Sequence, residues 1–256
     1  MKTFYYIMFF IIGTIFGSFY NVVGTRIPKG LSITKPRSHC EYCNHTLSWY
    51  ELIPVFSFIF LKGRCMECHH KLSLFYPFSE LATGLLFLIS YHSFGISWDL
   101  IISLTLVSTF IVVIVSDLSY LIISDRFIVI PSVIIIIITF IQKGLIQTLT
   151  QIGYGILTFG FMYLIMLLGN FMFKKESLGG ADIKLMFLIG LVLEPLLTII
   201  VLFLASFIAL PVSLYLLVKN KEHIVPYGPF LMVGLLIVYF TKLNIIEIFE
   251  KILTFF

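Results

Sequence analysis

The chain has 256 residues, of which 59% are apolar and only 12% are charged, and its mean hydropathy is +1.06. Soluble globular domains are about half apolar and about a quarter charged, so this composition excludes an ordinary soluble protein. The formal net charge of +4 favours contact with anionic lipids and gives no reason to expect nucleic-acid binding. No alternating strand pattern is visible, so the sequence predicts an all-α polytopic integral membrane protein.

The first apolar segment, residues 4–24, is about twenty residues long, which exceeds the apolar part of a signal peptide. No small-x-small cleavage site follows it, so we expect an uncleaved first span. Further apolar segments follow, and Glu194-Pro195 is expected to form a tight turn between two of them. About eight transmembrane helices are predicted, over residues 4–24, 76–95, 99–116, 126–142, 152–172, 183–198, 199–218 and 228–242.

These spans divide the chain into four parts. We expect a first transmembrane helix over 1–24, a four-cysteine zinc-binding domain over 25–75, a helical membrane domain over 76–242 and a tail over 243–256. The tail mixes apolar and charged residues at helical spacing, which is typical of an amphipathic helix lying in the membrane interface. No feature of the sequence defines an oligomeric state.

The distribution of basic residues predicts how the chain is oriented. Of the 17 lysines and arginines, thirteen lie in 25–75, at Arg126, or in 174–184 and 219–221; the others are Lys2, Lys143, Lys242 and Lys251. Cytoplasmic loops are enriched in lysine and arginine, so the first group is expected in the cytoplasm. This orientation requires an even number of spans and places the cysteines on the cytoplasmic side.

Four cysteines form two C-x2-C pairs, Cys40 with Cys43 and Cys65 with Cys68. In a reducing cytosol, such clustering favours metal binding over disulfides. Each pair can direct two thiolates at one tetrahedral ion, so the sequence predicts a structural zinc site without an open coordination position. Neighbouring histidines are expected to be solvated or to hydrogen-bond around the site rather than to bind the metal: His39, His45, His69 and His70.

Three aspartates lie at the predicted cytoplasmic ends of spans. Asp117 ends the third span, Asp125 precedes the fourth, and Asp182 opens the sixth. Carboxylates at membrane depth are costly and often functional, but an aspartate at a helix start can also simply cap the helix. The cap is the simplest interpretation of Asp125. Asp117 and Asp182 could share a proton as an aspartic-protease pair, or could serve a proton-coupled transporter equally well.

Four further residues are candidates for contact with a substrate. Gly179 and Gly180 precede Asp182 and would let the backbone bend and a substrate approach closely. Glu80 lies near the start of the second span, where it could enter a cleft or remain an interfacial carboxylate. Lys184 is expected to reach toward lipid headgroups rather than to pair with Asp182, because helix positions i and i+2 do not face each other.

Several segments, in order along nearly the whole chain, resemble the motifs of the type IV prepilin peptidases, which are GxGD-type intramembrane aspartic proteases of bacteria. The resemblance comes from "GSFYNVVGTRIPKG" (17–30), "PRSHCEYCNHTLSWYELIPVFSF" (36–58), "GRCMECHHKLSLFYPFSELATG" (63–84), "DLSYLIISD" (117–125), "GGADIKL" (179–185) and "VPYGPFLMVG" (225–234). Two departures from the family pattern are visible. Ala181 replaces a glycine but is still small, and Ser124 replaces a proline, which weakens that turn signal.

The resemblance implies that Asp117 and Asp182 form the catalytic pair and that Asp125 is an accompanying residue. It implies that residues 76–242 form the peptidase domain of a multi-pass protein of the bacterial inner membrane. The implied substrates are prepilins or pseudopilins, cut after a glycine at the cytoplasmic face. Family members often also methylate the new N-terminus with S-adenosylmethionine. That second activity rests on resemblance alone, because no glycine-rich nucleotide loop is visible.

Two other classes of function compete with the peptidase. An ion- or proton-coupled transporter would use the same intramembrane aspartates, but it would not explain the order of the cysteine loop, the D-x7-D segment and GGAD. A membrane anchor that docks pilus-assembly proteins through the cysteine loop would leave Asp117 and Asp182 without a role. The prediction is therefore an intramembrane aspartic endopeptidase, with the transporter as the alternative.

Overall fold

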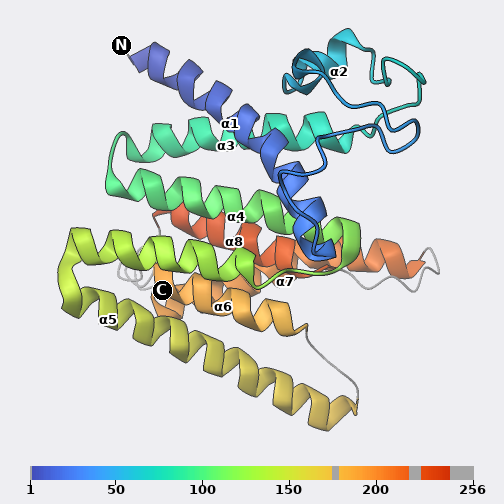
Figure 1. The fold of residues 1–256 in the computed structure, drawn as a ribbon. Coiled ribbons are helices and arrows are strands. Elements are labelled where there is room, and N and C mark those ends of the chain that lie inside the picture. Colours follow the sequence, from blue (N-terminus) through green and yellow to red (C-terminus); the bar gives the residue numbers. More distant parts are fainter. Residues whose placement is uncertain (1, 175–178, 219–225, 243–256) are drawn as a thin grey trace. The chain divides into compact units, whose positions relative to one another are not determined.

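The computed structural model describes residues 2–174, 179–218 and 226–242. Every regular element in this part of the chain is a helix, apart from two isolated β-bridges in the four-cysteine segment (Figure 1). The predicted all-α fold is therefore confirmed for the described residues. The amphipathic helix predicted over 243–256 lies outside them.

The described residues contain seven longer helices and three short ones. The short elements are η1 (Ile27–Lys29), η2 (Trp49–Leu52) and α2 (Phe56–Phe60). The longer helices are α1 (Lys2–Arg26), α3 (Phe75–Phe94), α4 (Trp98–Tyr120), α5 (Arg126–Phe173), α6 (Gly180–Val192), α7 (Pro195–Val218) and α8 (Gly228–Thr241).

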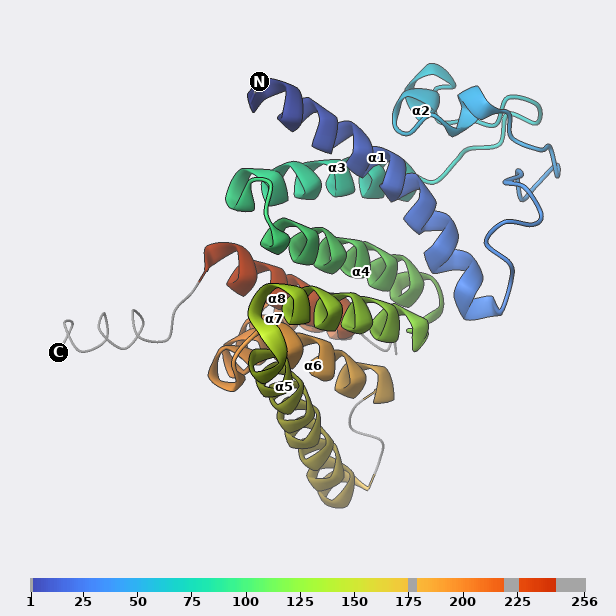
Figure 2. The same cartoon turned by 60° about the vertical axis from the view of Figure 1, so that its left-hand side comes forward.

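Helix α5 contains a sharp reversal at Gly144, where φ is 78° and ψ is −179°. Only glycine adopts this conformation readily, because any Cβ would clash with the backbone there. Figures 1 and 2 show the two arms of α5 on either side of this reversal. The predicted segments 126–142 and 152–172 consequently fall on different arms, as two separate helical stretches.

In the part of the chain that the structure describes, four helices are long and apolar enough to cross a membrane: Lys2–Lys29, Trp98–Tyr120, Arg126–Met172 and Pro195–Leu216. The helix α6 has 13 residues, about 20 Å of rise, which is less than the hydrocarbon core of about 30 Å.

The boundary predicted between 183–198 and 199–218 is wrong. Helix α6 ends at Val192, and Pro195 opens α7, because a first-turn position needs no N–H donor.

The chain divides into two compact units, Met1–Tyr120 and Leu121–Phe256. In the first unit, α1 packs against α3 and α4. A Cβ atom at Gly13 would lie 2.8 Å from the Cα of Gly84, and one at Gly17 would lie 2.8 Å from the Cα of Glu80. The two glycines of α1 therefore allow a close helix–helix approach, as small residues do in membrane proteins.

In the second unit, α6 packs against α5 and also contacts α7 and α8. Gly190 of α6 lies against the backbone of Tyr154 and Gly155 on the second arm of α5. The hydroxyl of Thr158 donates a hydrogen bond to the Met186 carbonyl at 2.9 Å, which ties the two helices together. The centre of this unit consists of apolar side chains with no exposed surface: Leu185, Met186, Leu188, Ile189, Leu231, Met232 and Leu235.

Candidate functional site

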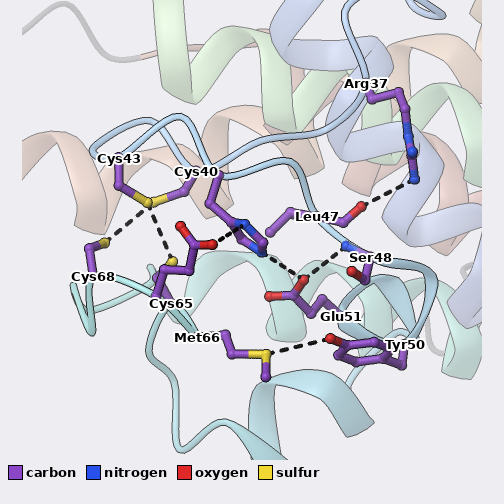
Figure 3. Close-up of polar contacts among 12 residues, drawn as sticks. Arg37, Cys40, Cys43, Leu47, Ser48, Tyr50, Glu51, Cys65, Met66 and Cys68 are labelled. Carbon is purple, nitrogen blue, oxygen red and sulfur yellow. Dashed lines mark hydrogen bonds and ion pairs between the residues drawn. The ribbon is translucent and has the colours of Figure 1, made fainter.

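The four cysteines lie together as the C-x2-C spacing predicts. Their sulfur atoms are within 4.8 Å of one another, with 3.8 Å between Cys40 and Cys68 and 3.9 Å between Cys43 and Cys65. Figure 3 shows the sulfurs converging from two loops of the segment. A tetrahedral zinc with sulfur ligands at about 2.3 Å requires sulfur–sulfur distances of about 3.8 Å. The geometry therefore suits one metal ion held by four thiolates.

Two similar turns create this arrangement. In the first, Cys40 N–H donates to the His45 carbonyl at 2.9 Å; in the second, Cys65 N–H donates to His70 at 2.9 Å. A left-handed residue follows each pair, Asn44 with φ of 58° and His69 with φ of 54°. The backbone N–H groups of Cys43 and Tyr42 lower the pKa of the Cys40 thiol to about 7. This favours the thiolate form of Cys40, which is the form that binds metal, whereas burial raises the pKa of Cys43 and of Cys68.

One histidine beside the cysteine pairs, His45, is bonded to two carboxylates. His45 Nε2 lies 3.1 Å from Glu51 Oε2, and Nδ1 lies 3.0 Å from Glu67 Oε1. The hydrogen bond to Glu51 raises the pKa of His45. Glu51 Oε2 also accepts the Ser48 N–H at 2.8 Å, which completes a capping box at η2. Since both ring nitrogens of His45 have partners, this histidine supports the loop, as predicted, and is not positioned as a ligand.

Asp182 lies in the first turn of α6 and is buried. A Cβ atom at Gly179 would lie 3.1 Å from Asp182 Oδ2, so the carboxyl group folds back over this glycine. Gly179 itself has an ordinary backbone (φ −67°), which corrects the expectation that glycine is needed there for a bend. Its small size is what matters. Gly180 is exposed and has open space around its Cα.

Asp117 lies in the last turn of α4 and is also buried. The helix continues to Tyr120, so Asp117 belongs to the helix instead of following it. Within residues 2–120, the structure shows no hydrogen bond or ion pair to its carboxyl group. Asp117 belongs to the first unit and Asp182 to the second, and the pairing of the two carboxyl groups stays a prediction.

The interpretation of Asp125 as a helix cap is wrong. It precedes α5, but its backbone is already helical and its side chain makes no capping bond. Instead, Oδ1 accepts a hydrogen bond from Lys184 Nζ at 2.6 Å. Lys184 therefore pairs with a carboxylate of another helix rather than reaching only for lipid headgroups. Lys184 does not pair with Asp182, which agrees with the prediction from helix geometry.

This ion pair lies at an open groove within the second unit. The groove has a volume of about 460 Å³, within the range of small-ligand pockets. Apolar side chains from both arms of α5 and from α6 make up most of its wall: Ile128, Val129, Ile156, Phe159 and Phe187.

Glu80 has a partner within its own unit. Its side chain is buried in α3, and Oε2 accepts the Val55 N–H at 2.8 Å. Val55 has φ of 64°, a costly conformation for a β-branched residue. Glu80 thus holds a strained turn of the four-cysteine segment against α3. A contact between Glu80 and substrate stays a prediction.

The sequence reasoning did not single out Tyr227, which precedes α8. Its hydroxyl lies 3.0 Å from Ser206 Oγ of α7, and the tyrosine is close enough to Asp182 to interact with it electrostatically. The only signal in the sequence was its place in the "VPYGPFLMVG" segment. Tyr227 therefore belongs to the surroundings of the second aspartate.

Two family profiles match the chain in succession. One, described as the bacterial peptidase A24 N-terminal domain, covers residues 11–94, and the type IV leader peptidase family covers residues 104–214. A prepilin leader peptidase/N-methyltransferase of Bacillus subtilis is 40% identical over 187 residues, which is 72% of each chain. The chain belongs to the type IV leader peptidase family. This confirms the resemblance seen in the motifs, and the apolar helices agree with a membrane protein.

Two other relatives extend the match over more of the chain. A prepilin leader peptidase/N-methyltransferase of Vibrio cholerae is 29% identical and covers 94% of this chain and 98% of the relative. A type 4 prepilin-like proteins leader peptide-processing enzyme of Escherichia coli is 30% identical and covers 87% and 88%. No solved structure matches the chain. None of these relatives supports the transporter alternative.

Proposed function

We propose that this protein is an intramembrane aspartic endopeptidase that removes the leader peptides of prepilins or pseudopilins at the cytoplasmic membrane face. The observation that carries the proposal is the placement of two buried aspartates in terminal turns of apolar helices, at the positions of the family's motifs. Asp117 occupies the last turn of α4, and Asp182 occupies the first turn of α6. Relatives of this chain are named as prepilin leader peptidases.

In the proposed reaction, the ionised member of the Asp117 and Asp182 pair takes a proton from water as the water attacks the carbonyl carbon after glycine. The protonated member donates its proton to the carbonyl oxygen. When the tetrahedral intermediate collapses, the C–N bond breaks and the departing amine receives a proton. Two close carboxyl groups share one proton readily, because a second negative charge nearby is unfavourable.

The membrane arrangement belongs to the same proposal. We assign about eight transmembrane segments, with α3, α6, α8 and both arms of α5 among them, in the bacterial inner membrane. The excess of lysine and arginine in 25–75 and 174–184 supports placing the four-cysteine segment and both aspartates at the cytoplasmic side. A substrate with an apolar helix would then lie in the bilayer with its leader at that surface.

The four-cysteine cluster fits a structural zinc ion held by Cys40, Cys43, Cys65 and Cys68. Four thiolates leave no open position for a water molecule, so the metal would stabilise residues 25–75 and take no part in the cleavage. S-adenosylmethionine would supply a methyl group to the new N-terminal amine. Within the described residues there is no βαβ unit, so no residue is assigned to this cofactor and no step is derived through it.

Co-expression of the chain with a prepilin tests the proposal. Mass spectrometry of the substrate's N-terminus should show cleavage after glycine with the wild type, and a further mass of one methyl group if the transferase is present. Asp117→Asn and Asp182→Asn should abolish cleavage, whereas the matched Asp125→Asn should retain it. Intact prepilins with the wild-type protein, across several substrates in intact membranes, would refute the peptidase.

A further inference from the structure

An uncovered apolar surface lies on the four-cysteine segment, in residues 49–60. Trp49 is 75% exposed, and Phe56, Ile59 and Phe60 of α2 are 61%, 63% and 81% exposed. The three α2 residues have i, i+3, i+4 spacing and therefore share one helix face. Phe58 turns the other way and packs against Gly63, whose Cβ would lie 2.8 Å from the phenylalanine ring.

The contacts of the Val55 turn place α2 relative to helices α1 and α3. Val55, directly before α2, is hydrogen-bonded to Glu80, and the Cα of Glu80 lies against Gly17 of α1. Gly17 is nine residues before Arg26, so this point is about 14 Å from the end of an apolar helix long enough to span a membrane. Helix α2 thus begins beside the apolar helices and not beyond their ends. Figures 1 and 2 show α2 near the beginning of α3.

Exposed apolar side chains also occur along the first turns of α3. Leu74 and Phe78 are 73% and 70% exposed, and Leu81 and Leu85 are exposed in the following turns. If α2 lay in water at this position, water would also contact the exposed apolar side chains of α3. Exposed apolar side chains are therefore present both on α2 and on the part of α3 that holds the preceding Val55 turn.

The charges of the segment agree with this location. Glu51 is the only charged residue in 49–60, and its side chain is 2% exposed and bonded to His45. The exposed part of the segment therefore carries no charge. Exposed Lys62 and Arg64 follow it directly, where they can contact anionic headgroups. Tryptophan and tyrosine, as at positions 49 and 50, are enriched at membrane interfaces.

The backbone N–H group that precedes α2 has a hydrogen-bond partner, as an apolar surrounding requires. In lipid, an N–H group without a partner is costly. The Val55 N–H before α2 has no helical partner, and the buried carboxyl group of Glu80 accepts it. The strained turn at Val55 is thereby held with its polar group satisfied.

We infer that residues 49–60 form an interfacial membrane anchor, with the exposed face of α2 inserted at the headgroup–acyl boundary of the bilayer. The partner is the lipid surface. The anchor would hold the four-cysteine cluster at the membrane surface, whichever reaction the aspartates carry out. This inference goes beyond the proposed peptidase and does not depend on it.

Tryptophan fluorescence of the full-length, metal-loaded protein in liposomes tests the anchor directly. The chain has two tryptophans, so Trp98→Phe leaves Trp49 as the sole reporter. Phosphatidylcholine brominated at carbons 6 and 7 should reduce its emission at least twofold, while aqueous iodide should have little effect. A second reporter, Phe60→Trp in the Trp49→Phe/Trp98→Phe background, should respond in the same way.

The matched control is Thr34→Trp in that background, at an exposed position beside the charged residues Lys35 and Arg37. It should be quenched by iodide and not by brominated lipid. Metal content verifies that each reporter variant is folded. Quenching of positions 49 and 60 by iodide would place the face in water, and protection from both quenchers would mean that protein covers it. Either result would overturn the inference.

Discussion

The four-cysteine segment and the aspartate-bearing helix ends differ in how the chain brings their candidate residues into place. All four cysteines come from residues 40–68, and two local turns bring their sulfurs to metal-binding distances. The aspartates come from α4 and α6, which belong to different compact units. The proposed metal site therefore depends on local backbone geometry, whereas the proposed aspartate pair would depend on helix packing. Substitutions should separate these two kinds of site.

The largest expected effect is at the aspartates. Asp117→Asn and Asp182→Asn should each lower the single-turnover cleavage rate by about 10³-fold or more, since each removes a group that must accept or donate a proton. If the two act as one unit, the double variant should be no slower than either single variant. Rates that multiply in the double variant would show that the carboxyl groups act independently.

The next largest effect is expected at the metal cluster. Cys65→Ser removes a buried ligand and should abolish stoichiometric zinc binding, because structural zinc contributes on the order of 10 kcal/mol to folding of such segments. Limited proteolysis should then cut within 25–75 and leave the helices intact. His39→Ala is the control: its ring bonds only to the Arg37 carbonyl, so metal content should be unchanged. Zinc retained at full stoichiometry in Cys65→Ser would contradict the four-thiolate site.

Helix packing provides a smaller, measurable contrast. Gly13→Ala places a methyl group 2.8 Å from the Gly84 backbone, which cannot move aside cheaply, and should destabilise the protein by about 1–3 kcal/mol. Gly160→Ala has open space around it and should stabilise α5 by up to about 1 kcal/mol. Thermal unfolding in detergent measures both. Equal effects at the two positions would argue against close α1–α3 packing.

The smallest effect is expected for the Lys184–Asp125 pair, whose side chains are 48% and 65% exposed. Such pairs contribute about 0–1 kcal/mol and weaken with salt. Lys184→Met should therefore lower stability only slightly, and the exchange Asp125→Lys with Lys184→Asp should restore it. A loss well above 1 kcal/mol, insensitive to salt, would show that the pair is enclosed by another part of the protein or by lipid.

The sequence predicted the local features well. The C-x2-C spacing predicted which four sulfur atoms lie together, because that arrangement depends on residues a few positions apart. The hydrophobic segments located the seven longer helices of the described residues, although the boundary between the sixth and seventh predicted spans was wrong and the short helices of residues 27–60 were not predicted. The interpretation of Asp125 as a cap was wrong. The sequence shows that Asp125 precedes a helix, but it does not show that the Asp125 side chain bonds to Lys184 of α6.

By itself, the sequence determined the membrane character, the four cysteines that lie together and the family. These follow from composition, short-range spacing and motifs, which need no knowledge of the packing. Only the tertiary structure revealed that Glu80 holds the strained Val55 turn, that Lys184 pairs with Asp125, and that Tyr227 approaches Asp182. These contacts join residues that are distant in the chain. Their partners are selected by the burial and close approach of helices, which one-dimensional spacing does not encode.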